Sequence, residues 1–260
     1  MAKPKVDRRK YRINPFRMAL ASVELDFREL ALLADFIESI IRQELASIEK
    51  WVADEVKKKT PEQLEESYEN ASGSCQVINQ YFRHRLRYSL LVTIYSVIES
   101  RLNDACGICK NAVNRAVSAK YSKDKKDNAS FELFPHQKEI SLDYTDIKGR
   151  GIERASLYLQ KVLKLSFPQK GRGPWQNIKI LANIRHCIVH TDGFDDEKKV
   201  ALFIKKHPDY AKYSDKGQLE IEAKYCMWIV EQAKNFFAEF YSSNMDVFNT
   251  QRETIYEDTR

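Results

Sequence analysis

The chain has 260 residues, of which 43% are hydrophobic and 31% are charged, and its formal net charge is +6. This composition excludes a disordered chain, which has too few apolar residues to bury, and an integral membrane protein, which carries fewer charges. Only eight glycines and seven prolines are present, which is too few for the many turns of an all-β fold, so we expect an all-α fold.

The first predicted element is a long helix over residues 18–59. Apolar residues recur there every three or four positions, with charged residues between them. Because a helix of this length would span about 60 Å, we expect a bend or a break inside it. Residues 1–17 hold seven Lys and Arg residues. With no apolar stretch behind them, they are interpreted as a flexible basic tail and not as a signal peptide.

A second helical pattern is predicted from Thr60 to about residue 117. Thr60, Pro61 and Gln63 form a helix start, in which the threonine caps, the proline fits the first helical position and the glutamine completes a capping box. The pattern is weakest at residues 71–74. Residues 86–102 are apolar nearly all round, so we expect them at the centre of the core.

The second half of the chain predicts shorter elements. Residues 119–147 lack periodicity and predict a long loop, and helices are expected over 152–165, 175–190 and 198–206. Gly193 can cap the second of these helices. A turn at 215–217 between apolar and aromatic residues predicts a small β-hairpin. An apolar helix over 222–241 follows.

We therefore predict four regions along the chain. They are the basic tail 1–17, a helical extension 18–60, a helical domain 61–245 and a polar, frayed tail 246–260. The longest nearly apolar run, residues 88–98, is shorter than the roughly 20 residues of a membrane span, so no contact with a membrane is expected.

A second basic zone covers residues 148–190, where nine Lys and Arg residues face one acidic residue, Glu153. Such a zone indicates a polyanionic partner, most often nucleic acid. The tetrapeptide Lys-Gly-Arg-Gly occurs twice in it, at 148–151 and 170–173. These loops either bind phosphates, because glycine lets backbone amides approach an anion, or simply end helices. The residues expected to bind the polyanion are Lys148, Arg150, Lys170, Arg172 and Lys179.

Five cysteines argue against a disulfide framework and for a reducing cytoplasm. Cys106 and Cys109 form a CxxC pair inside a helical stretch, without the second ligand pair of a structural zinc site, so we interpret them as structural thiols. His186 and His190 are spaced to share a helix face. The glutamate of an HExxH metal site is absent between them, so we expect neither a metal nor another cofactor.

Residues 181–193 place an arginine and two histidines near the end of a predicted helix. Its apolar stripe consists of Leu181, Ile184 and Ile188. The polar residues off this stripe are Asn183, Arg185, His186 and His190. Arginine binds and neutralises phosphoryl oxygens, and histidine transfers protons near neutral pH. The pattern suits phosphodiester chemistry; the alternative is a surface arginine beside a satisfied histidine.

With its flanks, this segment resembles the R-x4-6-H motif of the HEPN superfamily (higher eukaryote and prokaryote nucleotide-binding). Arg185 and His190 are the ends of the motif, and His186 follows the arginine where the family often has Asn, Asp or His. Residues 175–181 and the Val-His-Thr-Asp-Gly at 189–193 are similar to the family's lead-in and exit. Upstream, residues 91–103 are similar to the YSxxExxLN helix of large bacterial HEPN proteins. The resemblance covers roughly residues 80–242 and leaves residues 1–60 unexplained.

The resemblance implies a HEPN-like helical bundle, a symmetric homodimer that brings two R-x4-H motifs into one cleft, and a metal-independent endoribonuclease. His190 would act as general base or acid, and Arg185 would stabilise the pentacoordinate phosphate. Asn183 and His186 would position these groups or the RNA. Cleavage through the 2′-OH would leave a cyclic phosphate and a 5′-OH.

In biological terms the resemblance implies a toxin or a phage-defence effector with an antitoxin or a sensor protein as partner. The competing hypothesis is a non-catalytic helical module that binds RNA or a nucleotide through the basic zone. Glu99 lies in a mostly apolar helix, where an unpaired carboxylate is costly to bury. It either pairs with Arg185 and orients it, or it reaches solvent or pairs with Arg101.

Overall fold

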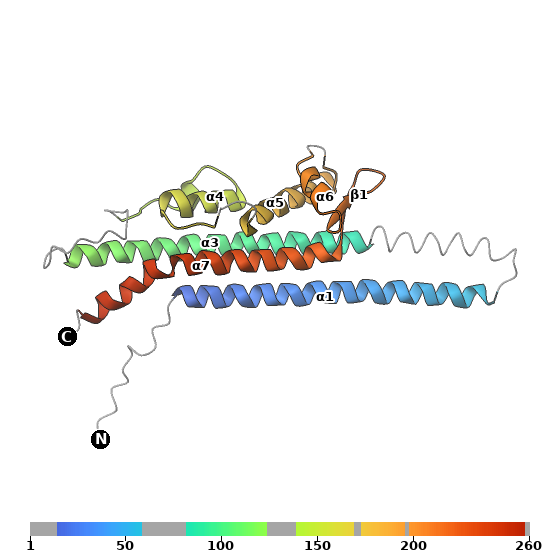
Figure 1. Ribbon diagram of the computed structural model, residues 1–260, viewed down its shortest axis with the longest axis horizontal. Helices are drawn as coiled ribbons and strands as arrows, with labels where there is room; N and C mark the ends of the chain where they lie inside the picture. Colours follow the sequence, from blue (N-terminus) through green and yellow to red (C-terminus); the bar gives the residue numbers. More distant parts are fainter. Residues whose placement is uncertain (1–14, 59–81, 124–138, 169–172, 196–197, 258–260) are drawn as a thin grey trace, which may run out of the picture. The chain divides into compact units, whose positions relative to one another are not determined.

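The computed structural model describes residues 15–58, 82–123, 139–168, 173–195 and 198–257, which are mainly helical and contain one short β-hairpin. The predicted all-α class, with a long N-terminal helix and a small hairpin, is confirmed. The elements, shown in Figure 1, are α1 (Pro15–Val56), α3 (Arg83–Lys123), α4 (Gly151–Leu157), α5 (Pro174–Thr191), α6 (Ala201–Lys206), β1 (Ala211–Tyr213), β2 (Leu219–Ile221) and α7 (Ala223–Glu257). No helix of the described residues is long and apolar enough to span a membrane.

Helix α1 is a single helix of 42 residues, so no break interrupts it. It begins at Pro15 and not at residue 18, because proline has a preset helical φ and its missing N–H is not needed in a first turn. The predicted helix start at Thr60 and the weak stretch at 71–74 lie outside the described residues.

Helices α3 and α7 both extend beyond their predicted ends. Helix α3 continues to Lys123, into the predicted loop, and α7 continues to Glu257, through the residues predicted as a frayed tail. Residues 118–123 and 242–257 contain neither glycine nor proline, so nothing in these stretches interrupts the backbone hydrogen bonds. Apolar periodicity reports which face of a helix is buried, and it therefore does not by itself fix where a helix ends.

By its internal contacts the chain separates into two compact parts. The first part comprises residues 1–26, 98–170 and 234–260, and the second comprises residues 27–97 and 171–233. Each of the three long helices contributes to both parts. The parts therefore do not coincide with the predicted regions 18–60 and 61–245, which stay predictions.

The first part is built around α3. Phe16 of α1 contacts Tyr241 of α7 edge-on, with ring centroids 5.7 Å apart. Cys106 and Cys109 are buried, and the Cys106 thiol donates to the carbonyl of Ala155 on α4. Burial raises the pKa of Cys106 to about 12, so the thiol is protonated and unreactive at neutral pH. Both thiols are free and buried, which agrees with the structural interpretation of the CxxC pair.

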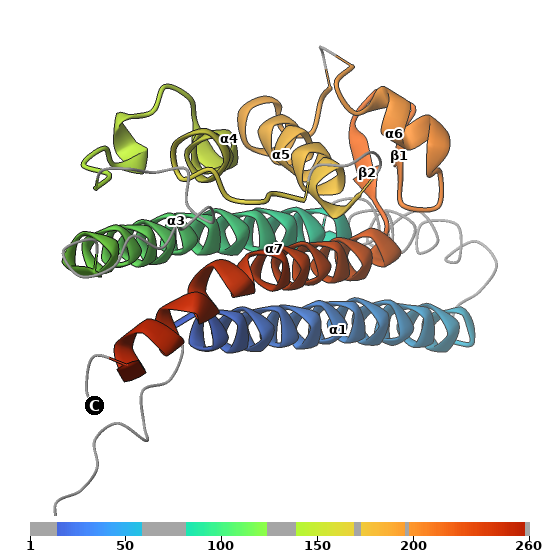
Figure 2. The same cartoon turned by 60° about the vertical axis from the view of Figure 1, so that its left-hand side comes forward.

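In the second part, α3 and α7 lie between α1 on one side and α5, α6 and the hairpin on the other (Figures 1 and 2). Strand β1 pairs antiparallel with β2, with Lys212 opposite Glu220. The hairpin predicted around residues 215–217 is confirmed. Helix α5 faces this core with a stripe of buried side chains in steps of three, namely Trp175, Ile178, Leu181, Ile184 and Cys187.

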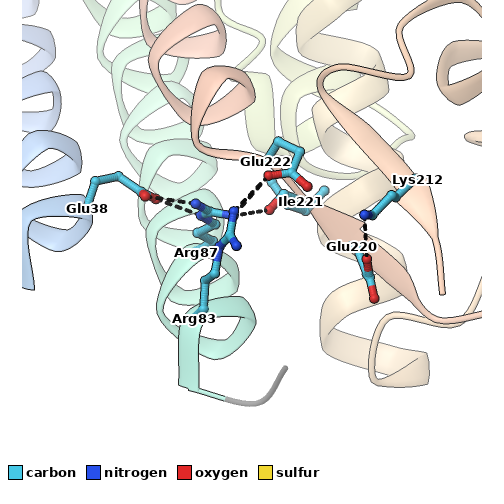
Figure 3. A network of polar contacts seen from close by, with 7 residues as sticks. All are labelled: Glu38, Arg83, Arg87, Lys212, Glu220, Ile221 and Glu222. Carbon is cyan, nitrogen blue, oxygen red and sulfur yellow. Dashed lines mark hydrogen bonds and ion pairs between the residues drawn. The ribbon is translucent and has the colours of Figure 1, made fainter. Parts of the chain in front are cut away.

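A buried arginine joins α1, α3 and the hairpin within the second part (Figure 3). Arg87 of α3 is only 2% exposed, and it donates to both carboxylate oxygens of Glu38 on α1, at 2.6 and 2.8 Å. Its Nη1 also donates to the carbonyl of Ile221 at 2.8 Å and to Glu222 at 3.4 Å. A buried guanidinium is tolerated only when its donors are satisfied, so these bonds specify how the three elements meet.

Candidate active site on helix α5

Helix α5 carries the segment in which the sequence places the arginine and the two histidines. Pro174 occupies its first turn, where a missing N–H costs nothing. The predicted stripe is correct for Leu181 and Ile184, which are fully buried. It is wrong for Ile188, which is half-buried, because the buried stripe proceeds in steps of three to Cys187.

The side chains of Arg185 and His190 approach each other along α5. The Nη1 atom of Arg185 lies 3.5 Å from the Nε2 atom of His190. A guanidinium has only N–H donors, so a hydrogen bond between these atoms requires Nε2 as the acceptor. Arg185 is half-buried and His190 is exposed. The pair offers a fixed positive charge beside a nitrogen that can accept a proton.

Tyr95 of α3 supports the guanidinium of Arg185. The Cζ atom of Arg185 lies 5.7 Å from the centroid of the Tyr95 ring, within the range of a cation–π contact. The Nε atom of Arg185 is buried and has no hydrogen-bond partner among the described residues. Sequence reasoning did not single out Tyr95 as a site residue. Its one signal was its place in the YSxxExxLN stretch.

Lys179, Asn183 and His186 share the face of α5 on which His190 lies. Helix residues three, four and seven positions apart stand on the same side. The ring centroids of His186 and His190 are 4.7 Å apart, and the rings are tilted by 44°. Both histidines are exposed, whereas Lys179 and Asn183 are half-buried. One helix face thus combines an ammonium, an amide and two imidazoles.

A left-handed turn ends α5 just after His190. Asp192 has a φ of 52° and Gly193 a φ of 89°, and the Gly193 N–H donates to the carbonyl of Cys187 at 2.9 Å. Gly193 thus takes part in the cap as predicted, although Asp192 is the first residue with positive φ. A Cβ atom on Gly193 would lie 2.4 Å from the hydroxyl of Tyr88, so this position requires glycine.

The Tyr88 hydroxyl fills the space next to Gly193. Tyr88 is 4% exposed, and its hydroxyl donates to the carbonyl of Leu219 on β2. Burial raises the pKa of Tyr88, and the negative charge of Asp192 adds to this effect. Tyr88 therefore remains a neutral donor that links α3, the hairpin and the end of α5.

Arg85 and the hairpin hold the same turn through Asp192. Arg85 of α3 donates to both carboxylate oxygens of Asp192, at 2.6 and 3.1 Å. The side chain of Gln218 donates to the Asp192 carbonyl at 2.6 Å, and the Leu219 N–H donates to the Gly193 carbonyl at 2.8 Å. These contacts were not predicted, because Arg85 and Asp192 lie 107 positions apart in the sequence.

Lys148 and Arg150 are exposed in the loop that leads into α4. Gly149 has a φ of 137°, and its carbonyl accepts two hydrogen bonds from Arg154, at 3.0 and 2.8 Å. These features shape the start of a helix, which favours the helix-end alternative for this tetrapeptide. The basic residues of the second tetrapeptide, at positions 170 and 172, lie outside the described residues.

Glu99 is half-buried on α3 and belongs to the first compact part, whereas Arg185 belongs to the second. The pairing of these two residues stays a prediction. Arg101, the alternative partner of Glu99, donates to Asp26 and to Asp104. A common surface for the basic residues stays a prediction for the same reason, because Lys148 and Lys179 belong to different parts.

Within the described ranges, no three His, Cys, Asp or Glu side chains gather as ligands of a metal ion would. His186 and His190 are the nearest approach to such a group on α5. Compared with known protein families, with curated proteins and with solved structures, the chain matches none of them. A functional assignment therefore depends on the side chains of α5 and on the residues that hold them.

Proposed function

We propose that the chain is a metal-independent endoribonuclease that cleaves RNA through the ribose 2′-hydroxyl, with Arg185 and His190 as its catalytic residues. The observation that carries this proposal is the 3.5 Å distance between Arg185 Nη1 and His190 Nε2. Cleavage by an internal hydroxyl needs a proton acceptor and a cation for the phosphoryl oxygens, and these two side chains supply both. The resemblance of residues 181–193 to the HEPN motif supports the same reaction.

In the proposed reaction, Nε2 of His190 removes the proton from the 2′-hydroxyl. The 2′-oxygen attacks the adjacent phosphorus, and the bond from phosphorus to the 5′-oxygen breaks with its electron pair on that oxygen. Arg185 exchanges its contact with His190 for N–H bonds to the phosphoryl oxygens, where negative charge grows in the transition state. The 5′-oxygen takes a proton from an acid. The products are a 2′,3′-cyclic phosphate and a 5′-hydroxyl.

The other polar residues are proposed to support this reaction. Asn183 and His186 share the face of His190, where they position the imidazole or the RNA. Glu99 is proposed to orient Arg185 by pairing with it. The residues proposed to bind the RNA backbone are Lys148, Arg150, Lys170, Arg172 and Lys179.

One copy of α5 does not readily supply both a base and an acid on opposite sides of the scissile phosphate. A two-fold axis through the site would double Arg185 and His190, and such pairing is the commonest geometry of oligomers. We therefore propose a homodimer in which the two copies share one cleft. This enzyme would act in the cytoplasm as a toxin or a phage-defence effector, controlled by an antitoxin or a sensor protein.

The test is cleavage of single-stranded RNA by the purified protein in EDTA. Arg185→Ala and His190→Ala should each slow cleavage by at least about 100-fold, the range of one acid–base group, and the cleaved RNA should carry 5′-hydroxyl ends. Both variants should unfold near the wild-type temperature, because neither residue lies in the buried stripe. Arg28→Ala, which removes an exposed arginine from α1, is the matched control and should cleave normally. Recovery of chelated enzyme only with zinc or manganese would contradict the proposal.

The shared cleft has its own test. Wild type is co-expressed with a tagged Arg185→Ala/His190→Ala chain, and the heterodimer is isolated. A composite site should leave far less than half of the wild-type activity. A heterodimer with half of the activity, or a monomer by light scattering at working concentration, would contradict the composite site.

The alternative is a non-catalytic helical module that binds RNA or a nucleotide. The exposure of Lys148 and Arg150 favours a binding role without requiring chemistry at α5. RNA that is bound and remains intact, both in EDTA and with added divalent metals, would select this alternative.

A further inference from the structure

Five rings form a cluster where α6 meets the hairpin and α7 in the second compact part. We call it the ring stack, and its members are Phe203, His207, Tyr210, Tyr225 and Trp228. The ring centroids of His207 and Phe203 are 4.9 Å apart. The His207 ring stacks on the Tyr210 ring, with a centroid distance of 5.7 Å and an interplanar angle of 14°. Trp228 is 5.1 Å from Tyr210. The rings thus contact one another continuously from α6 to α7.

The ring stack is buried at one end and open at the other. Phe203 and Tyr225 are 5% and 0% exposed and belong to the core. Tyr210 and Trp228 are half-buried, and His207 is exposed. Rings supported from beneath cannot collapse when the outer ring meets a ligand. The open end is therefore an exposed imidazole that packs against other rings.

The chain geometry explains why His207 is exposed. Helix α6 ends at Lys206, and Pro208 prevents its continuation. The Tyr210 N–H then donates to the His207 carbonyl at 3.0 Å. This hydrogen bond closes a turn that begins at His207 and ends at Tyr210. On the other side, the Glu222 N–H donates to the Tyr210 carbonyl at 2.9 Å and ties the turn to the start of α7.

Three lysines are near the ring residues in the sequence. Lys205 and Lys206 directly precede His207, and Lys224 lies four residues before Trp228, on the same face of α7. All three lysines are exposed, and none forms an ion pair with another described residue. Between Phe203 and Tyr210 two lysines accompany one carboxylate, Asp209. The carboxylate of Glu222, near Lys224, is paired with Arg83 and Arg87.

We propose that the ring stack binds a nucleobase of single-stranded RNA, with Lys205, Lys206 and Lys224 on the adjacent phosphates. The choice of RNA as the ligand rests on the proposed function. The ring stack would give the RNA a second contact, outside the α5 site. Every base has a flat π-face that stacks on aromatic rings, and lysines neutralise the backbone beside it. Protein–protein interfaces are depleted in lysine, so the three exposed lysines favour nucleic acid over a protein partner.

The test measures binding of a fluorescein-labelled, fully 2′-O-methylated oligonucleotide by anisotropy. This strand lacks the 2′-hydroxyl nucleophile, so it reports binding without cleavage. His207→Ala should raise Kd at least about fivefold, which corresponds to the loss of one stacked base. Lys205→Ala/Lys206→Ala should reduce the slope of log K against log salt by about 1.4, the value for two phosphate contacts on a single strand.

One further variant separates stacking from folding, and two others serve as controls. His207→Phe keeps a ring face at the open end and should bind as tightly as wild type, even if His207→Ala alters the local turn. Phe36→Ala and Lys50→Ala are matched controls, because they remove an exposed ring and an exposed lysine from α1. Both controls should leave Kd and the salt slope unchanged.

The proposal is overturned if Kd and the salt slope of the His207 and lysine variants equal those of wild type, or if wild type does not bind the strand. Competition by micromolar AMP alone would also overturn it, in favour of a free nucleotide. These outcomes are independent of the α5 site. Arg185→Ala/His190→Ala should still bind the methylated strand, and a wild type that binds it but never cleaves natural RNA would refute the nuclease and leave the ring stack standing.

Discussion

The guanidinium of Arg85 and the carboxylate of Asp192 form a two-bond ion pair that joins the start of α3 to the end of α5, two residues beyond His190. Their side chains are 54% and 55% exposed. Water competes for such a pair, so its direct contribution to stability is below about 1 kcal/mol. Its effect is geometric, because it restrains the turn that directly follows His190 and the last residue of α5.

Arg85→Gln should therefore separate activity from stability. We expect a free energy of unfolding within about 1 kcal/mol of wild type, but RNA cleavage slowed by about 10- to 100-fold, as for a slightly misplaced catalytic group. Asp192→Asn should show the same loss, and the double variant no further loss, in a comparison of kcat/KM. Normal cleavage by both single variants would show that the pair does not position His190.

Gly193→Ala should destabilise the protein more than the same change at another glycine with positive φ. A Cβ atom at Gly193 meets both an unfavourable φ and the Tyr88 hydroxyl at 2.4 Å, and the two effects together cost about 2–5 kcal/mol. Gly217 has a φ of 79° and nothing within 4 Å of its Cβ position, so Gly217→Ala should cost only about 1–2 kcal/mol. Urea denaturation compares the two. Equal losses would contradict the close approach of Tyr88.

Arg87→Met should lower the free energy of unfolding by about 3–5 kcal/mol, because it leaves the carboxylate of Glu38 without its buried partner. Adding Glu38→Leu should recover part of this loss, since no unpaired charge then remains. The control is Lys212→Met, which breaks the pair with Glu220 drawn in the same view (Figure 3). The lysine side chain of this pair is 58% exposed. It should cost less than about 1 kcal/mol.

His84 should make the stability depend on pH. Burial lowers the pKa of His84, the charge of Glu220 opposes this shift and that of Arg87 reinforces it. Because the pKa of His84 is lower in the folded protein than in the unfolded chain, folding favours the neutral imidazole. This contribution to stability is fully present above the unfolded pKa of about 6.5. It is lost as the pH falls through the folded pKa.

The measurement is the free energy of unfolding in urea between pH 8 and pH 5. Wild type should lose stability over this range, and His84→Leu should lose less. His190→Ala, which removes an exposed histidine, should follow the wild-type curve. A decline that is the same with and without His84 would contradict the prediction.

The buried faces of the helices could be predicted from the sequence better than the helix ends could. The stripe through Leu181 and Ile184 was correct, because burial of one helix face leaves a periodic trace in the sequence. The ends of α3 and α7 were missed, because their last turns carry no such trace. The place of Cys187 in the stripe was missed as well, since a small drift in helix phase decides between Cys187 and Ile188.

The sequence by itself determined the helical class, the hairpin and the common face of Asn183, His186 and His190, because these follow from local spacing along the chain. The tertiary structure alone decided what surrounds that face. Tyr95 supports Arg185, Tyr88 fills the space beside Gly193 and Arg85 holds Asp192. Each of these contacts joins α3 to α5, and residues so far apart in the chain meet only when both helices bury their apolar stripes in one core.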